Sequence, residues 1–179
     1  MTVLIVSTCA EPLSEAEFLA PLVRIIREAG KTVENIHLKN PFDVPVGISH
    51  ILLGGTALQD DKYLKENTGI KPLLEADVPL LAICSGMQLL AAVCGGEIII
   101  QREIGMVQVK TVAENPLCSG NFEAFVLHHR AIKPGPQFEV LAQSKSCVQA
   151  IRNCELPHYG VLFHPEVRNE QVVQNFLAL

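Results

Sequence analysis

Apolar residues in the first half of the chain follow two different patterns. Short apolar or alternating runs predict four buried β-strands, over Val3–Val6, Thr32–Leu38, His50–Leu53 and Val78–Ile83. Between these runs, apolar positions three or four residues apart predict helices. The first has Ser14 as its N-cap and Glu17 as its capping-box partner, and it ends at Gly30. The others cover Asp60–Ala76, where Thr68-Gly69 is a potential break, and Ser85–Cys94. This alternation of strands and helices favours a parallel sheet.

The second half of the chain is richer in strands. Strands are predicted over Glu97–Ile100, Val107–Val112, Phe122–Leu127, Phe138–Ala142, Val148–Ile151 and Tyr159–Phe163, with Gly, Pro and Asn turns between them. A helix over Asn169–Leu179 follows the last strand. Together the two halves predict one α/β domain over residues 1–179. It has three layers, with a mostly parallel central sheet, helices on both faces, and mixed or antiparallel strands in the second half.

The turn after the fourth predicted strand carries the first chemical signal. The apolar run of Val78–Ile83 stops at Cys84, and a helix-forming segment begins at once with Ser85-Gly86. A nucleophile elbow has this strand–turn–helix form, and here a cysteine takes the place of the serine. A thiolate at a helix N-terminus is stabilised by the unpaired N–H groups there. Cys84 is therefore the candidate nucleophile, although most buried cysteines are inert core thiols.

Two other strand ends supply groups that such a nucleophile needs. His164 follows the strand ending at Phe163 and is the candidate base, with Glu166 two residues further on. If the segment is extended, both side chains point the same way, so that Glu166 orients the imidazole. Gly54-Gly55 ends the third strand, either as a plain turn or as one half of an oxyanion hole. In the second case the N–H groups of Gly55 and Ser85 hold the oxyanion.

Composition narrows the range of functions. The 179 residues include 49% apolar and 18% charged side chains, with a net charge of −5 and no basic cluster, so no nucleic-acid partner is expected. The first residues resemble a strand and not a secretory leader, and no apolar run is long enough for a membrane span. The six cysteines contain no C-x-x-C pair, which indicates reduced thiols in the cytoplasm.

Neither a cofactor nor a metal is expected from the motifs. The chain lacks the phosphate-binding and dinucleotide-binding glycine motifs. His128-His129 has no carboxylate or cysteine at ligand spacing, so no metal site is predicted there. His37, His50 and His158 are expected at the surface or in loops.

The order and spacing of these motifs resemble class I (triad) glutamine amidotransferases, which share a flavodoxin-like fold. The motifs are Gly54-Gly55, Cys84-Ser85-Gly86-Met87-Gln88 and His164-Pro165-Glu166, so that the resemblance covers nearly the whole chain. The segment Gly160–Val167 with Asn175-Phe176 is most similar to the glutaminase part of GMP synthase. Ala82 stands where the family usually has Gly, and Thr56 where Pro usually follows Gly-Gly.

The resemblance implies a role for each matching residue. Cys84, His164 and Glu166 would form a catalytic triad that hydrolyses L-glutamine through a γ-glutamyl thioester. Gly55 and Ser85 would provide the oxyanion N–H groups, and Gln88 would hold the glutamine side chain. The segment containing Leu127, His129 and Arg130 would bind the α-amino and α-carboxylate groups. Ammonia would pass to an ATP-dependent synthetase on another chain.

Two alternatives remain open at this point. The segment His128–Lys133 is similar to γ-glutamyl hydrolases, which cleave γ-glutamyl peptides without a partner. A catalytically silent regulatory relative is the other alternative. The presence of Cys84, His164 and Glu166 together argues against a silent protein.

Overall fold

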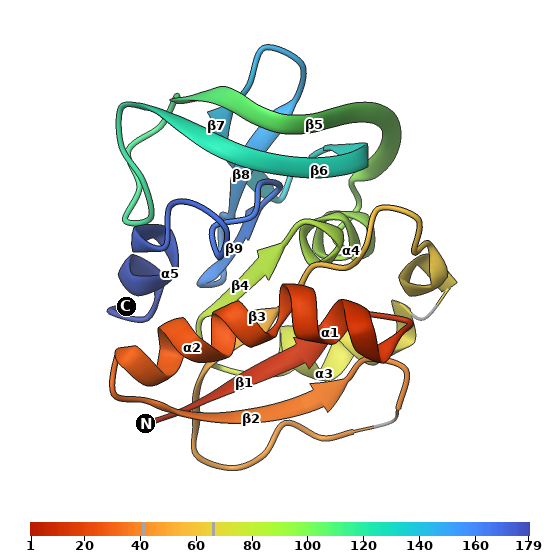
Figure 1. The fold of residues 1–179 in the computed structure, drawn as a ribbon, viewed down its shortest axis with the longest axis vertical. Helices are drawn as coiled ribbons and strands as arrows, with labels where there is room; N and C mark the ends of the chain where they lie inside the picture. The colour runs from red at the N-terminus through yellow and green to blue at the C-terminus, as the bar shows by residue number, and fades with distance from the viewer. Residues whose placement is uncertain (41, 66) are drawn as a thin grey trace.

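The computed structural model describes residues 1–40, 42–65 and 67–179, and a nine-stranded sheet runs through these residues (Figure 1). Its strand order is β2-β1-β3-β4-β9-β8-β7-β5-β6. The strands are β1 (Thr2–Ser7), β2 (Thr32–His37), β3 (Ile48–Leu53), β4 (Leu80–Ile83), β5 (Glu97–Thr111), β6 (Asn121–Lys133), β7 (Phe138–Gln143), β8 (Val148–Asn153) and β9 (His158–Val161). The α-helices are α1 (Pro12–Phe18), α2 (Ala20–Glu28), α3 (Lys71–Glu75), α4 (Ser85–Val93) and α5 (Gln171–Phe176).

The parallel part of the sheet brings the predicted site segments to one edge. Strands β2, β1, β3, β4 and β9 are parallel neighbours, in the order expected for a flavodoxin-like sheet. The carboxyl ends of β1, β3, β4 and β9 therefore lie together. Gly54, Cys84 and His164 all follow such ends.

Helices cover both faces of this sheet, which confirms the three-layer prediction. Val3, Ile5, Leu52, Leu81 and Ile83 pack on one face against α1, α2 and α5. The alternate strand residues, among them Leu4, Val6, Leu53, Leu80 and Ala82, pack on the other face against α3 and α4. Alternation along each strand thus fills two separate cores, which explains why the strands are apolar throughout.

The second half of the sheet is antiparallel, as predicted, but its first two strands are longer than expected. Residues 97–111 form the single strand β5, which pairs along most of its length with β6. The two strands form a long ribbon (Figure 1). Many of its side chains are exposed, so the polar residues of its middle do not interrupt it. The ladder is irregular between Ile100 and Glu103, which is the signature of a β-bulge.

Four other local predictions were wrong. Asp60–Ala76 forms short 3₁₀ helices at Lys62–Lys65 and Asn67–Ile70 followed by α3, and residue 66 lies outside the described residues. The first helix begins at Pro12 after Glu11, so Ser14 is not its N-cap, and it breaks at Leu19 into α1 and α2. Helix α5 is shorter than Asn169–Leu179. His50 and His158 are buried, because they occupy β3 and β9 near the centre of the sheet.

Gly86 permits α4 to pass close over the end of β3, and an added methyl group is expected to destabilise the fold. A Cβ at position 86 would lie 2.5 Å from the Leu53 carbonyl oxygen, which is backbone and does not yield easily. We expect Gly86→Ala to lower the free energy of unfolding by about 1–3 kcal/mol. Urea denaturation measures this. Gly54→Ala is the matched control, since its Cβ would come no closer than 3.4 Å to any neighbour. Equal stabilities of the two variants would contradict the close-packing argument.

Candidate active site

Cys84 occupies a strained turn between β4 and α4. Its φ of 49° and ψ of −107° are rare for a residue with a side chain, and such conformations cost on the order of 1–3 kcal/mol. The surrounding backbone holds the turn, since the Cys84 N–H donates to the Val161 carbonyl (2.8 Å) and the Gln88 N–H donates to the Cys84 carbonyl (3.1 Å). The side chain is 4% exposed, and its Sγ lies 3.8 Å from the Leu127 carbonyl oxygen.

His164 and Glu166 form a buried pair behind Cys84. The His164 Nδ1 lies 2.8 Å from the Glu166 Oε1, and both side chains are almost fully excluded from solvent. The Phe18 and Phe125 rings flank the imidazole, with centroids 5.4 and 6.4 Å away. The pair is formed by a turn and not by an extended segment, because the N–H groups of residues 167 and 168 point to the His164 carbonyl. The predicted contact is present, but the extended geometry given for it was wrong.

Charge keeps the His164 imidazole protonated. Burial alone would lower the pKa of His164, but the negative charges of Cys84 and Glu166 and the hydrogen bond to Glu166 raise this pKa well above its ordinary value. The Nε2 atom of His164 has no hydrogen-bond partner among the described residues. With Nδ1 directed to Glu166, Nε2 is the nitrogen available for proton transfer.

The Gly54-Gly55 turn packs directly against both reactive side chains. A Cβ on Gly55 would lie 3.1 Å from the His164 Cε1 and 3.4 Å from the Cys84 Cβ, so a side chain there would press on the imidazole. The Thr8 hydroxyl fixes the turn by donating to the Gly54 carbonyl (3.1 Å), and it lies 2.9 Å from the Ser85 hydroxyl. Ser85 is the first residue of α4, a position whose N–H has no partner within the helix. The N–H groups of both candidate oxyanion residues thus belong to segments held beside Cys84.

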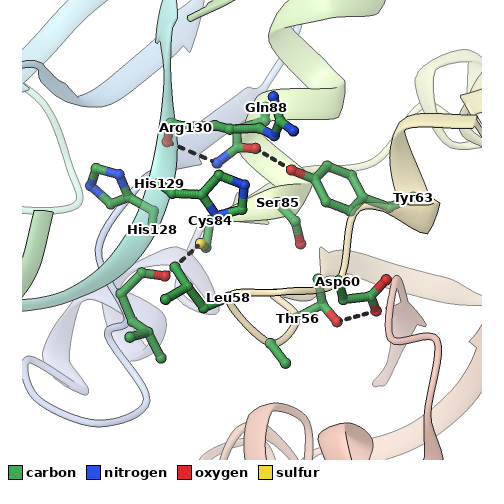
Figure 2. Close-up of a pocket in the computed structure, with 12 residues that line it drawn as sticks. Thr56, Leu58, Asp60, Tyr63, Cys84, Ser85, Gln88, His128, His129 and Arg130 are labelled. Carbon is green, nitrogen blue, oxygen red and sulfur yellow. Dashed lines mark hydrogen bonds between the residues drawn. The ribbon is translucent and has the colours of Figure 1, made fainter. Parts of the chain in front are cut away.

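A pocket opens at the carboxyl edge of the sheet beside Cys84 (Figure 2). Among the predicted residues, Cys84, Ser85, Gln88, Leu127, His129 and Arg130 line it. Gly55, His164 and Glu166 do not line it. The pocket therefore presents the sulfur, while the imidazole and carboxylate lie beneath it.

One wall of the pocket is held by side-chain contacts that the sequence did not predict. The Gln88 amide donates to the Arg130 carbonyl (3.1 Å) and accepts from the Tyr63 hydroxyl (Figure 2). Burial, together with the nearby Cys84, raises the pKa of Tyr63, so the phenol remains a donor. The Arg130 guanidinium binds both oxygens of Asp61, at 3.1 and 2.7 Å. This ion pair lowers the pKa of Asp61 and directs Arg130 to the rim of the pocket.

Comparison with known proteins places the chain in a family. A family model described as glutamine amidotransferase class-I matches residues 14–178. The chain is a class I glutamine amidotransferase. A glutamine-hydrolyzing GMP synthase subunit of Pyrococcus furiosus is 32% identical to it over 91% of this chain and 93% of that protein. The corresponding subunit of Methanocaldococcus jannaschii is 31% identical over 87% and 95%.

A solved structure supports the same fold. The crystal structure of a Thermoplasma acidophilum protein, provisionally named as a subunit of GMP synthase, superposes with a TM-score of 0.89 and 21% identity. The superposition covers 99% of the amidotransferase and 92% of that chain. The predicted family and fold class are therefore confirmed. No helix among the described residues of the amidotransferase has the length and apolar character needed to span a membrane.

The amidotransferase accommodates its departures from the family pattern by local packing. Ala82 pairs in register with Gly160 of β9, and a Cβ on Gly160 would lie 2.8 Å from the Met87 Cγ. The methyl group of Ala82 thus lies beside Gly160, which has no side chain. At the other departure, the Thr56 hydroxyl donates to the Asp60 Oδ2 (2.8 Å). The same oxygen accepts from the Ala10 N–H at 2.6 Å, which ties this loop to the one after β1.

Several residues that support this site from other segments of the chain were not predicted from the sequence. Thr8 and Cys9 follow β1, and the Cys9 thiol donates to the Gly55 carbonyl at 3.4 Å. Burial raises the pKa of Cys9, so this thiol stays protonated. Their position after a parallel strand was the available signal. Tyr63 and Asp61 carried no such signal, because they lie in a segment predicted to be helical.

Proposed function

We propose that this amidotransferase hydrolyses L-glutamine to glutamate and ammonia, and that it passes the ammonia to a separate ATP-dependent synthetase subunit that forms GMP. The observation that carries the proposal is the buried His164–Glu166 pair (2.8 Å) beside Cys84, whose side chain lines the pocket at the carboxyl edge of the sheet. The GMP assignment is supported by the two curated relatives, which are separate GMP synthase subunits matched over more than nine-tenths of their length.

Each proposed catalytic step follows from the position of a group. The Cys84 thiolate attacks the carboxamide carbon of glutamine, and the N–H groups of Gly55 and Ser85 stabilise the resulting oxyanion. The His164 Nε2 then gives its proton to the departing ammonia, which leaves a γ-glutamyl thioester on Cys84. His164 next removes a proton from water, which attacks the thioester and releases glutamate. Glu166 keeps the imidazole oriented throughout.

In the proposed binding mode, the wall made by Gln88, Leu127, His129 and Arg130 holds the substrate. Gln88 is already fixed by Tyr63 and by the Arg130 carbonyl, so it is positioned before glutamine enters. The guanidinium of Arg130 is bound to Asp61. We therefore assign the backbone of this segment, and not the Arg130 charge, to recognition of the substrate's α-amino and α-carboxylate groups.

A reconstitution experiment tests this function. The chain is mixed with the ATP-dependent subunit of a GMP synthase, and GMP formation is measured with glutamine or with ammonium chloride as the nitrogen source. We expect glutamine-dependent synthesis to require this chain and to fail with Cys84→Ala. Ammonium-dependent synthesis should proceed without the chain and without its Cys84→Ala variant. Rapid cleavage of γ-glutamyl peptides by the isolated chain, with no support of GMP synthesis, would instead favour a hydrolase.

The charge of Glu166 is expected to set the alkaline limit of glutamine hydrolysis. A raised pKa means that His164 keeps its proton at neutral pH and loses it as the pH rises through the folded-state value. Glu166→Gln removes one of the two charges that raise this pKa, so the alkaline limb of the kcat profile should move to lower pH. Glutamate release measured across pH tests this. Glu34→Gln, an exposed change on β2, is the control. An unmoved limb in Glu166→Gln would contradict the assigned role.

A further inference from the structure

Three potential metal ligands meet behind the pocket wall, and one of them is His128, for which the sequence showed no further ligand nearby. Glu103 comes from β5, His128 from β6, and Cys147 from the turn between β7 and β8. One donor atom from each lies within 4.8 Å of the other two. The Cys147 Sγ is 3.2 Å from the Glu103 Oε2, and the His128 Nε2 is 3.6 Å from the same oxygen. The side chains of His128 and Glu103 are 1% and 9% exposed.

The backbone fixes which nitrogen of His128 faces this cluster. The Nδ1 atom lies 3.1 Å from the Gln101 carbonyl, which only accepts hydrogen bonds, so Nδ1 carries the hydrogen. The neutral ring then presents the lone pair of Nε2 to the Glu103 carboxylate. This Nε2 is buried and has no hydrogen-bond partner among the described residues. Two buried acceptors that face each other repel, and a cation between them removes the repulsion.

The spacing suits a small tetrahedral ion. In a tetrahedral site, metal–ligand bonds of about 2.0–2.3 Å place the ligand atoms about 3.3–3.8 Å from one another. The observed distances from the Glu103 Oε2 to the Cys147 Sγ and the His128 Nε2, 3.2 and 3.6 Å, are close to this range. Groups around the ligands already orient them. The Ser144 hydroxyl donates to the Glu103 Oε1 (3.0 Å), and the Gln101 carbonyl holds His128. Such outer contacts are typical of metal centres.

The ligand chemistry indicates the class of ion. One thiolate, one imidazole and one carboxylate form the mixed set that Zn²⁺ accepts, while Mg²⁺ and Ca²⁺ prefer oxygen alone. The negative charges of the carboxylate and the thiolate also neutralise a divalent cation, so the buried site has no net charge. The fourth position falls to Gln149, which is fully buried and whose Oε1 has no partner among the described residues. Its nitrogen now donates to the Glu103 Oε2 (2.8 Å) and lies 3.4 Å from the Cys147 Sγ. Rotation of the amide would exchange the hydrogen bond to Glu103 for an oxygen directed at the ion.

We propose that Glu103, His128 and Cys147 bind a divalent cation of the zinc class. Binding replaces the thiol proton of Cys147, which is released to solvent, and it involves no redox step. The His128 ring lies on the side of β6 opposite to the His129 ring (Figure 2). The ion therefore joins β5, β6 and the β7–β8 turn behind the pocket. It would also fix the backbone of Leu127, whose carbonyl faces the Cys84 sulfur.

The test is carried out in the Cys84→Ala background, because the Cys84–His164 pair is itself able to capture zinc. The chelator-treated protein is titrated with Zn²⁺ against a chromophoric chelator, and the metal retained after desalting is measured. We expect one equivalent of Zn²⁺ to be retained. Adding Cys147→Ser should weaken binding by more than about 100-fold, since even outer-shell partners contribute about 10–100-fold. Adding Cys154→Ser, which changes an exposed cysteine, should leave binding unchanged.

Two measurements keep the outcome decisive if a ligand variant folds poorly. Co²⁺ added to the Cys84→Ala protein should give a thiolate-to-cobalt absorption band and tetrahedral visible bands, and Zn²⁺ should raise its melting temperature relative to a chelator. Glu103→Gln, which keeps the size and an acceptor oxygen, should also lose binding. The proposal is overturned if the Cys84→Ala protein retains no zinc and shows no thiolate band, or if the Cys147→Ser addition binds zinc equally well.

Discussion

Alanine at position 84 should abolish glutamine hydrolysis and leave the fold intact. Loss of a triad nucleophile lowers kcat by about 10⁴-fold or more, because residues of a triad act as a unit. The adjacent Ser85 hydroxyl is not placed to replace the sulfur, since it is turned to Thr8 and the Gly54 carbonyl. Alanine and cysteine both carry a Cβ, so the substitution does not change the energetic cost of the strained backbone at this position.

Two measurements check this expectation. Glutamate release is compared between the wild type, Cys84→Ala and Cys154→Ala, the last of which removes an exposed thiol as the control. A diazo-ketone analogue of glutamine should add covalently to the wild type and to the control, but not to Cys84→Ala, as seen by mass spectrometry. Equal glutamate release by Cys84→Ala and the wild type would refute the nucleophile assignment.

Replacing His164 by alanine should damage both activity and stability, for separate reasons. Activity falls by about 10³-fold or more, because the group that protonates ammonia and activates water is lost. Stability falls because Glu166 is left as a buried charge without the partner that it has at 2.8 Å. Breaking a buried pair from one side costs about 3–5 kcal/mol.

A second substitution separates these two effects. Adding Glu166→Gln to His164→Ala removes the uncompensated charge, so stability should recover in part while activity remains lost. Urea denaturation and glutamate release are measured on the single and the double variant. If the double variant is no more stable than His164→Ala, the buried charge is not the cause of the loss. If His164→Ala keeps full kcat, the histidine is not the proton-transfer group.

The residues predicted most successfully are those that directly follow a buried parallel strand. Such strands are recognised locally, from short apolar runs, and their carboxyl ends meet at one edge whatever their order in the sheet. This is why Gly55, Cys84 and His164 could be brought to one place from the sequence. The same reasoning explains why the fold class was predicted well in the parallel half.

Predictions failed where contacts depend on distant partners. Residues 101–106, which include three polar side chains and a glycine, were left outside the predicted strands, but pairing with β6 continues β5 through them as part of a ribbon. Glu103 and Cys147 reach His128 from two other strands or turns, at sequence separations that no motif encodes. Tyr63 supports Gln88 from a segment whose helical period was misleading, since it forms short 3₁₀ turns.

The position of β9 has a consequence for synthesis on the ribosome. Strand β4, which ends at the nucleophile, finds its partner β9 only after residues 84–157 have been made. Until then the nascent chain has β2, β1, β3 and β4 with an unpaired edge at β4, and such edges invite wrong pairing. His164 also follows β9, so Cys84 lacks its catalytic base during this interval. The triad is therefore absent from the incomplete chain, and the step that closes the sheet is the step that assembles it.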